Sequence, residues 1–192
     1  MVKFVSDLQS EPMDILQTIQ TRQSVRKYSS APVEREKLER CLEAARLAPS
    51  ACNAQPWKFI VVDKPDLKKE VAGAAKHMGF GMNRFVDDAP VIIAIVMEPA
   101  NFTSEFGSKV KRKHYPLIDI GIAAEHFCLQ ATAEGLGTCM LGWLNEKKVK
   151  KALNIPSMRR VPLLISLGYP ATDKQKSRKR KPLDKIVSYN AY

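Results

Sequence analysis

The most constraining feature of the sequence is an unbroken apolar run, PVIIAIVM, at residues 90–97. Valine and isoleucine dominate this run and no polar side chain alternates with them, which is the pattern of a strand buried on both faces. A sheet that contains such a strand needs a layer of helices on each side. The chain has 192 residues, of which 45% are hydrophobic. That length is enough for one domain with a sizeable core and short for two.

A second apolar segment, residues 117–134, predicts a long helix. Its apolar residues lie nearly all round the helix rather than along one stripe, so we expect the helix to be covered on more than one side. Asp119 and Glu125 interrupt the segment, which favours a buried helix over a membrane span. In a chain of this size, a second subunit can supply the additional cover.

The remaining periodic segments alternate between helices and strands. They predict helices at residues 12–21, 33–48, 66–75 and 146–153, and strands at residues 58–63, 138–143 and 161–170. This order predicts an α/β (α+β) fold of three layers around one sheet. We treat residues 1–192 as a single domain, with a core at residues 12–170 and a basic C-terminal extension at residues 171–192.

The charge of the chain points to anionic partners. Lys and Arg total 31 and Asp and Glu total 20, which gives a net charge of +11. Such a surplus favours nucleic acid, a membrane surface or a phosphorylated small molecule. Residues 98–116 are polar and contain Lys109, Lys111 and Arg112, and we expect a loop there. No stretch reaches the roughly 18 apolar residues of a membrane span and no signal peptide is visible, so we expect a cytoplasmic protein.

Neither a metal site nor a self-contained catalytic motif is visible. Cys41, Cys52, Cys128 and Cys139 have no CxxC spacing, so we expect no bound metal and no dithiol redox motif. The sequence contains no GxGxxG, GxxxxGK[ST], GxSxG or HExxH pattern, and its three histidines are isolated. If the chain is an enzyme, a cofactor must supply the chemistry.

Two separated segments have the residue types of a site for an anion and a heterocycle. In TRQSVRKY, an extended backbone would place Arg22, Ser24 and Arg26 on one side, which suits a phosphate or a polyol. In PSACNAQPW, Asn53 and Gln55 offer paired donors and acceptors that can bind the edge of a planar ring. The alternatives are a solvated basic loop for the first segment and an ordinary turn for the second.

A third segment, SRKRKP at residues 177–182, is strongly basic. Arg178 and Arg180 would share one face of an extended backbone and could bind a phosphate. The alternatives are a solubilising tail and non-specific contact with nucleic acid. No aromatic residues interleave the basic ones, which argues against binding of single-stranded nucleic acid.

Taken in order, these segments resemble the nitroreductase family of FMN-dependent NAD(P)H oxidoreductases. The resemblance rests on TRQSVRKYSSAPV, ARLAPSACNAQPWKFIVV, GLGTCMLGWL and RKPLDKIV, and it covers roughly residues 12–190. It implies a mixed, largely antiparallel sheet flanked by helices, and an intertwined homodimer with FMN at the interface. It also implies a ping-pong reaction in which NAD(P)H reduces FMN, and FMN then reduces a small electron-poor acceptor such as a nitroaromatic or a quinone.

The resemblance also assigns roles to individual residues. Those implied to bind FMN are Arg22, Gln23, Ser24, Arg26, Pro49, Ser50, Ala51, Asn53, Gln55, Asn83, Met140, Leu141, Gly142, Arg178 and Arg180. Residues 49–53 would come from the partner subunit, and Arg26 would adjust the flavin at N1 and O2. No side chain is implied to be catalytic, since FMN carries the chemistry. The chain departs from the family pattern at Gln23, where a second Arg is common, and at Cys52, where a small hydroxyl residue is common.

Two alternatives remain open at this point. The chain could use reduced flavin for a different reaction, such as dehalogenation or flavin breakdown. It could also be a basic nucleic-acid-binding module, in which case DNA binding should weaken steeply with salt.

Overall fold

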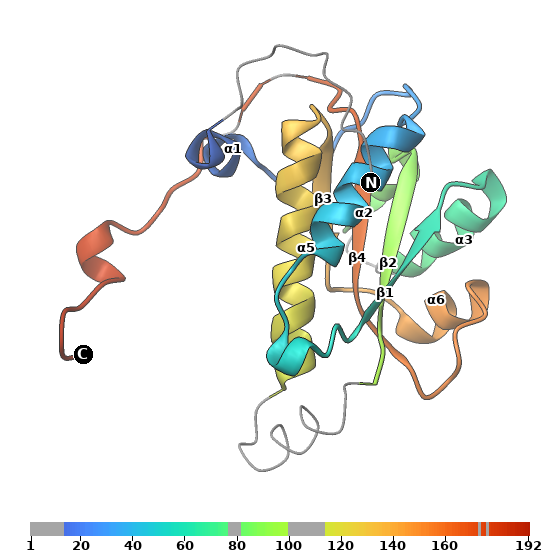
Figure 1. The fold of residues 1–192 in the computed structure, drawn as a ribbon. Helices are drawn as coiled ribbons and strands as arrows, with labels where there is room; N and C mark the ends of the chain where they lie inside the picture. Colours follow the sequence, from blue (N-terminus) through green and yellow to red (C-terminus); the bar gives the residue numbers. More distant parts are fainter. Residues whose placement is uncertain (1–13, 77–81, 100–113, 173, 176) are drawn as a thin grey trace, which may run out of the picture.

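The computed structural model describes residues 14–76, 82–99, 114–172, 174–175 and 177–192 (Figure 1). Most of the expected basic loop at residues 98–116, with Lys109, Lys111 and Arg112, lies outside the described residues. The first residues of the helix expected at 12–21 lie outside them as well.

The centre of the structure is an antiparallel sheet of four strands. Its strands are β1 (Trp57–Val62), β2 (Val91–Met97), β3 (Gly137–Leu141) and β4 (Arg160–Gly168), in the order β1-β2-β4-β3. Each neighbouring pair is antiparallel, and Ile93 lies opposite Val61 on one side and Ile165 on the other. A single parallel bridge joins Ser24 to Thr138 at the β3 edge. The expected mixed, largely antiparallel sheet is therefore confirmed.

Strand β2 is buried on both faces, as its apolar run predicts. Ile92 and Ala94 pack into one apolar cluster, whereas Ile93 and Ile95 pack into another on the opposite face. All four side chains are fully shielded from solvent. The alternation of the strand thus divides the core into two halves, one on each side of the sheet.

Helices cover both faces of the sheet and confirm the three-layer prediction (Figure 1). On one face lie α2 (Arg35–Arg46) and α5 (Tyr115–Ala133), and on the other lie α3 (Pro65–Ala75) and α6 (Glu146–Ala152). The short helix α1 (Ile15–Thr21) packs against the outer side of α5. The C-terminal residues run past α1 and away from the sheet (Figure 1).

The helix ends follow local capping chemistry. The side chain of Asp14 accepts a hydrogen bond from the Leu16 N–H at 3.3 Å and begins α1. Asn145 caps α6 by accepting from the Lys148 N–H at 3.1 Å, as its position in the sequence predicts. The expected helices 33–48 and 146–153 are present with ends displaced by one or two residues, which is the usual uncertainty of such boundaries.

Three short 3₁₀ helices were not expected from periodicity. They are η1 (Ala51–Asn53), η2 (Arg84–Asp88) and η3 (Leu183–Lys185). In η1, Cys52 and Asn53 both have a φ of 52°, the left-handed conformation that non-glycine residues seldom adopt. Such segments are too short to show a hydrophobic period, so sequence patterns do not reveal them.

Large apolar side chains remain exposed on several outer surfaces of the single chain. They include Ile15, Leu16 and Ile19 on α1, Leu117 and Ile118 on α5, and Leu183 and Ile186 in the C-terminal segment. The incomplete cover of α5 agrees with the expectation of a second subunit, and the homodimer itself stays a prediction. Among the described residues, no helix is long and apolar enough to cross a membrane.

Alkaline pH should destabilise the fold through its buried thiols. Burial raises the pKa of Cys41 and of Cys128 to about 12 from an ordinary value near 9. Between these values the unfolded chain loses protons that the folded chain keeps, so the free energy of unfolding should fall as pH rises. The slope should approach about 1.4 kcal/mol per pH unit for each thiol between the two pKa values, measured by urea unfolding between pH 9 and 11.

Substitutions can assign this slope to individual thiols. Cys41→Ala should reduce the slope, whereas Cys52→Ser, at an exposed position, should leave it unchanged. An unaltered slope in the Cys41 variant would contradict the assignment.

Candidate functional site

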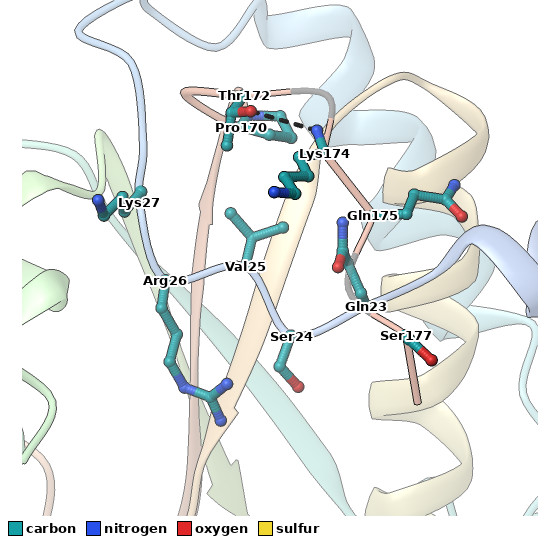
Figure 2. Close-up of a pocket in the computed structure, with 10 residues that line it drawn as sticks. All are labelled: Gln23, Ser24, Val25, Arg26, Lys27, Pro170, Thr172, Lys174, Gln175 and Ser177. Carbon is teal, nitrogen blue, oxygen red and sulfur yellow. Dashed lines mark hydrogen bonds between the residues drawn. The ribbon is translucent and has the colours of Figure 1, made fainter. Parts of the chain in front are cut away.

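The polar segment that follows α1 lies along the free edge of strand β3. The Val25 N–H donates to the Thr138 carbonyl at 2.8 Å, and Ser24 and Thr138 form a parallel bridge. Tyr28 bridges Pro170 at the end of β4. The segment is therefore extended, and Figure 2 shows Ser24 and Arg26 pointing to one side of it and Val25 to the other. This is the alternation that the sequence predicts.

A buried tyrosine fixes this segment to the sheet. The Tyr28 hydroxyl lies 2.7 Å from Ser166 Oγ and donates to the Val25 carbonyl at 3.0 Å. Burial raises the pKa of Tyr28, so the hydroxyl keeps its proton and remains a donor. The backbone from residue 25 to residue 28 is thus held from inside the core.

Two glycines permit the close approach of this segment to the sheet. A Cβ atom added to Gly137 would lie 2.5 Å from Val25 Cγ2. A Cβ atom added to Gly168 would lie 2.4 Å from Pro90 Cδ and 3.0 Å from Tyr28 Cδ1. Since these distances are far below van der Waals contact, only glycine fits at either position.

A pocket of about 610 Å³ lies between this segment and the C-terminal extension (Figure 2). Most of its lining residues are polar or basic, and Val25 and Pro170 are apolar. The lining residues are Gln23, Ser24, Val25, Arg26, Lys27, Pro170, Thr172, Lys174, Gln175 and Ser177. The structure thus brings Gln23, Ser24 and Arg26 together, as the sequence predicts.

Three arginines converge beside this pocket. The Arg178 guanidinium donates to the backbone carbonyls of Gln20 and Arg22 at the end of α1. Desolvation, followed by the nearby charges of Arg180 and Arg22, lowers the pKa of Arg178. Arg22, Arg178 and Arg180 are therefore neighbours in the fold, although 156 residues separate Arg22 from Arg178 in the sequence. Like charges gathered in this way favour an anionic ligand.

A second group of predicted residues meets at the far end of β3. The Asn83 amide donates to the Ala75 carbonyl at 3.0 Å and makes a longer contact of 3.5 Å with the Trp143 carbonyl. Trp143 follows Gly142, so Asn83 lies beside the predicted run Met140–Gly142. A Cβ atom added to Gly142 would meet nothing within 4 Å, which leaves its backbone accessible.

An aromatic ring supports Arg26, and sequence reasoning did not identify it. The Arg26 guanidinium carbon lies 5.9 Å from the centroid of the Phe85 ring, within reach of a cation–π interaction. Phe85 belongs to η2, directly after Asn83 and Arg84. The sequence around Phe85 is glycine-rich and has no regular period, so no local pattern predicts the contact of Phe85 with Arg26.

The segment 49–55 forms a tight turn of its own. Its Gln55 N–H donates to Ser50 Oγ at 2.9 Å, and the Gln55 side-chain amide donates to Asn53 Oδ1 at 3.1 Å. The two amides that sequence analysis paired therefore do lie in contact. None of Pro49, Ser50, Ala51, Asn53 and Gln55 lines the pocket beside residues 23–27. The placement of Pro49, Ser50, Ala51 and Asn53 in a site of the partner subunit stays a prediction.

A buried carboxylate on α5 holds this turn. Asp119 is only 4% exposed, and its Oδ1 accepts a hydrogen bond from the Ala51 N–H at 3.2 Å. Its Oδ2 has no hydrogen-bond partner among the described residues. In the sequence Asp119 is visible only as a polar interruption of an apolar helix, and that interruption is the available signal.

The pocket also contains polar residues that sequence analysis did not propose. Lys27, Thr172, Lys174, Gln175 and Ser177 line it, and of these only Ser177 belongs to the basic segment at residues 177–182. Their role depends on how the extension folds back over residues 23–27, which is a tertiary contact without a local pattern. Within the described ranges, no cluster of His, Cys, Asp and Glu could hold a metal ion.

Comparison with known proteins gives consistent matches along most of the chain. A family model described as "Nitroreductase family" matches residues 19–169. The solved structure of an FMN-dependent nitroreductase from Clostridium difficile is 30% identical, with a TM-score of 0.74 over 92% of this chain and 99% of that one. An NADH dehydrogenase of Thermus thermophilus is 29% identical over 86% of this chain and 91% of its own length. Iodotyrosine deiodinase 1 of Mus musculus is 28% identical over 94% and 71%, respectively.

Enlarging Gly137 should displace the segment that carries the site. In Gly137→Ala, the new Cβ would clash with Val25, so we expect a loss of about 1–3 kcal/mol in the free energy of unfolding. Hydrogen exchange should also become faster at the Val25 amide, which donates to Thr138. Gly73→Ala is the matched control, because its Cβ meets nothing within 4 Å and lies in helix α3. Equal effects of the two variants would contradict the close-approach explanation.

Proposed function

The chain belongs to the nitroreductase family, and from this premise we propose that it is a homodimeric FMN-dependent oxidoreductase. In the proposed ping-pong reaction, NAD(P)H first reduces FMN. The reduced FMN then reduces an electron-poor acceptor such as a nitroaromatic or a quinone. The names of similar proteins support the proposal, since one is an FMN-dependent nitroreductase and another an NADH dehydrogenase. The family establishes an oxidoreductase, and the donor and acceptors are the proposed part.

The observation that carries the proposal is the convergence of Arg22, Arg178 and Arg180 beside an extended polar segment. A phosphate dianion needs several charge-assisted donors, and three guanidiniums supply them. Desolvation is the largest cause of the lowered pKa of Arg178, and repulsion by the nearby charges of Arg180 and Arg22 lowers it further. An anion placed among them would relieve the repulsion. The residues present therefore fit the phosphate of FMN.

The neighbouring residues fit the rest of such a ligand. The Ser24 hydroxyl and the Gln23 amide lie beside the arginines and can bind a polyol chain. Arg26 is our candidate for the cation that stabilises negative charge at the N1 and O2 edge, and its contact with Phe85 keeps it in place. The open backbone at Gly142 suits close contact with a planar ring.

The segment 49–55 would complete the site from the partner subunit. Asn53 and Gln55 present amide groups that can bind a ring edge, and Asp119 fixes the turn by its bond to Ala51. We assign no catalytic acid or base to the chain, because solvent can supply the proton to the product. The protein's contribution is then binding, orientation and electrostatic stabilisation.

A dehalogenation reaction is the second candidate. It is favoured by the match to iodotyrosine deiodinase 1, which covers 94% of this chain. The two reactions can be separated by offering the reduced protein a nitroaromatic, a quinone and a halogenated tyrosine in parallel. Nitroaromatic or quinone turnover without halide release would support the first candidate.

The direct test of flavin chemistry is a visible absorbance spectrum under anaerobic conditions. The purified chain should acquire a bound-flavin spectrum when titrated with FMN, and the spectrum should bleach on addition of NADH or NADPH. The more effective nucleotide identifies the donor. A chain that never binds FMN but shifts DNA with a steep dependence on salt would instead support the nucleic-acid alternative.

Removing one of the converging arginines should weaken the binding of a flavin that carries a phosphate and leave the binding of an unphosphorylated flavin unchanged. For Arg180→Ala we expect the Kd for FMN to rise by roughly 10- to 100-fold, because one charge-assisted donor is lost. The Kd for riboflavin, which lacks the phosphate, should stay the same. Fluorescence titration measures both, and Lys181→Ala serves as the control within the same basic run. Equal losses for both ligands would contradict the phosphate assignment.

A further inference from the structure

A carboxylate of helix α5 contacts one of the three converging arginines. Glu125 Oε1 lies 3.2 Å from Arg22 Nε, with the two side chains 44% and 21% exposed. The contact joins Glu125 to Nε, and the terminal nitrogens of Arg22 donate no hydrogen bond to another group within the described part of the chain. The ion pair thus engages the guanidinium at Nε, and its two terminal nitrogens are the donors that a ligand could use.

The backbone of Arg22 is fixed as well. Its N–H donates to the Thr18 carbonyl at 2.9 Å and closes the last turn of α1. Its carbonyl accepts from Arg178. Because the main chain and Nε are both held, little rotational freedom is left to the group that would contact a phosphate.

The charge of Glu125 is unfavourable for an anion site. A carboxylate next to the place where a phosphate dianion would bind repels that dianion and partly cancels the charge of Arg22. Three other basic side chains nearby, Arg178, Arg180 and Lys174, form no ion pair with a carboxylate among the described residues. A function in orienting Arg22 would explain why a carboxylate is present at this place.

We propose that Glu125 is a positioning residue, which holds Arg22 through Nε so that both terminal nitrogens remain available to the phosphate monoester of the flavin. The proposal rests on the proposed function, since it specifies how the same site selects a phosphorylated ligand. Glu125 itself does not touch the ligand. Its effect is selectivity for FMN over the unphosphorylated flavin.

This role and a simple charge effect predict opposite results for the same substitution. If Glu125 only repels the phosphate, its removal must tighten FMN binding. If it orients Arg22, its removal must weaken FMN binding, because the free guanidinium then loses rotational freedom on binding. Glu125→Gln separates the two effects, because it keeps an oxygen acceptor for Nε while it removes the negative charge.

The test compares Glu125→Ala and Glu125→Gln with the native full-length chain, freed of flavin and titrated with FMN and with riboflavin. For the alanine variant we expect about a tenfold increase in the Kd for FMN and no change for riboflavin. For the glutamine variant we expect FMN binding at least as tight as in the native chain. Glu43→Ala is the matched control, since Glu43 Oε2 binds Arg46 Nε at 2.6 Å in a similar exposed pair on α2.

Each other outcome overturns the proposal. Tighter FMN binding in both Glu125 variants would show that the carboxylate acts only by repulsion. Parallel losses for FMN and riboflavin would show a general structural role, and FMN binding by Glu125→Ala equal to the native chain would show no role. Failure of the native chain to bind either flavin would instead reject the proposed function, so the two failures are distinguishable.

Discussion

The burial of helix α5 against the sheet is the constraint on which the other parts of the structure depend. Its inner side, with Phe127 and Ile120, packs with α2 and with strands β2 and β4 in one apolar cluster. The same helix contacts α1, η1 and β3. Because packing in the core fixes the position of α5, polar side chains on the sides of α5 that do not face the core can anchor neighbouring segments.

Two acidic residues of α5 anchor neighbouring segments in this way. Asp119 binds the turn at Ala51, and Glu125 binds Arg22 at the end of α1. The two carboxylates are six residues apart, which corresponds to about 9 Å along the helix. One rigid helix thus holds two of the segments that the family resemblance assigns to the flavin, at different positions along its length. In a single chain the two segments do not share the pocket beside residues 23–27, which agrees with a site completed by a second copy.

Much of this arrangement could be predicted from the sequence, because strong local patterns govern it. The unbroken apolar run gives β2, and the alternation of Arg22, Ser24 and Arg26 gives one polar face of an extended segment. The family motifs give the pairing of distant residues such as Arg22 and Arg178, which no local pattern contains.

The features that could not be predicted depend on tertiary contacts. The strand order β1-β2-β4-β3 follows from long-range pairing, and the contact of Phe85 with Arg26 joins an irregular stretch to an edge segment. The left-handed conformation of Cys52 and Asn53 depends on a turn that Asp119 holds from another helix. In each case the residue type alone is compatible with several environments.

The central claim is that each site combines the arginine cluster of one chain with residues 49–55 of another. The most direct measurement mixes two flavin-free variants, Arg22→Ala with Arg180→Ala in one chain and Ser50→Ala with Asn53→Ala in the other. After unfolding, mixing and refolding, half of the dimers should be hybrids with one intact site each, so about a quarter of all sites should bind FMN and turn over NAD(P)H. If both segments of a site came from the same chain, every site in the mixture would remain defective and no activity would return.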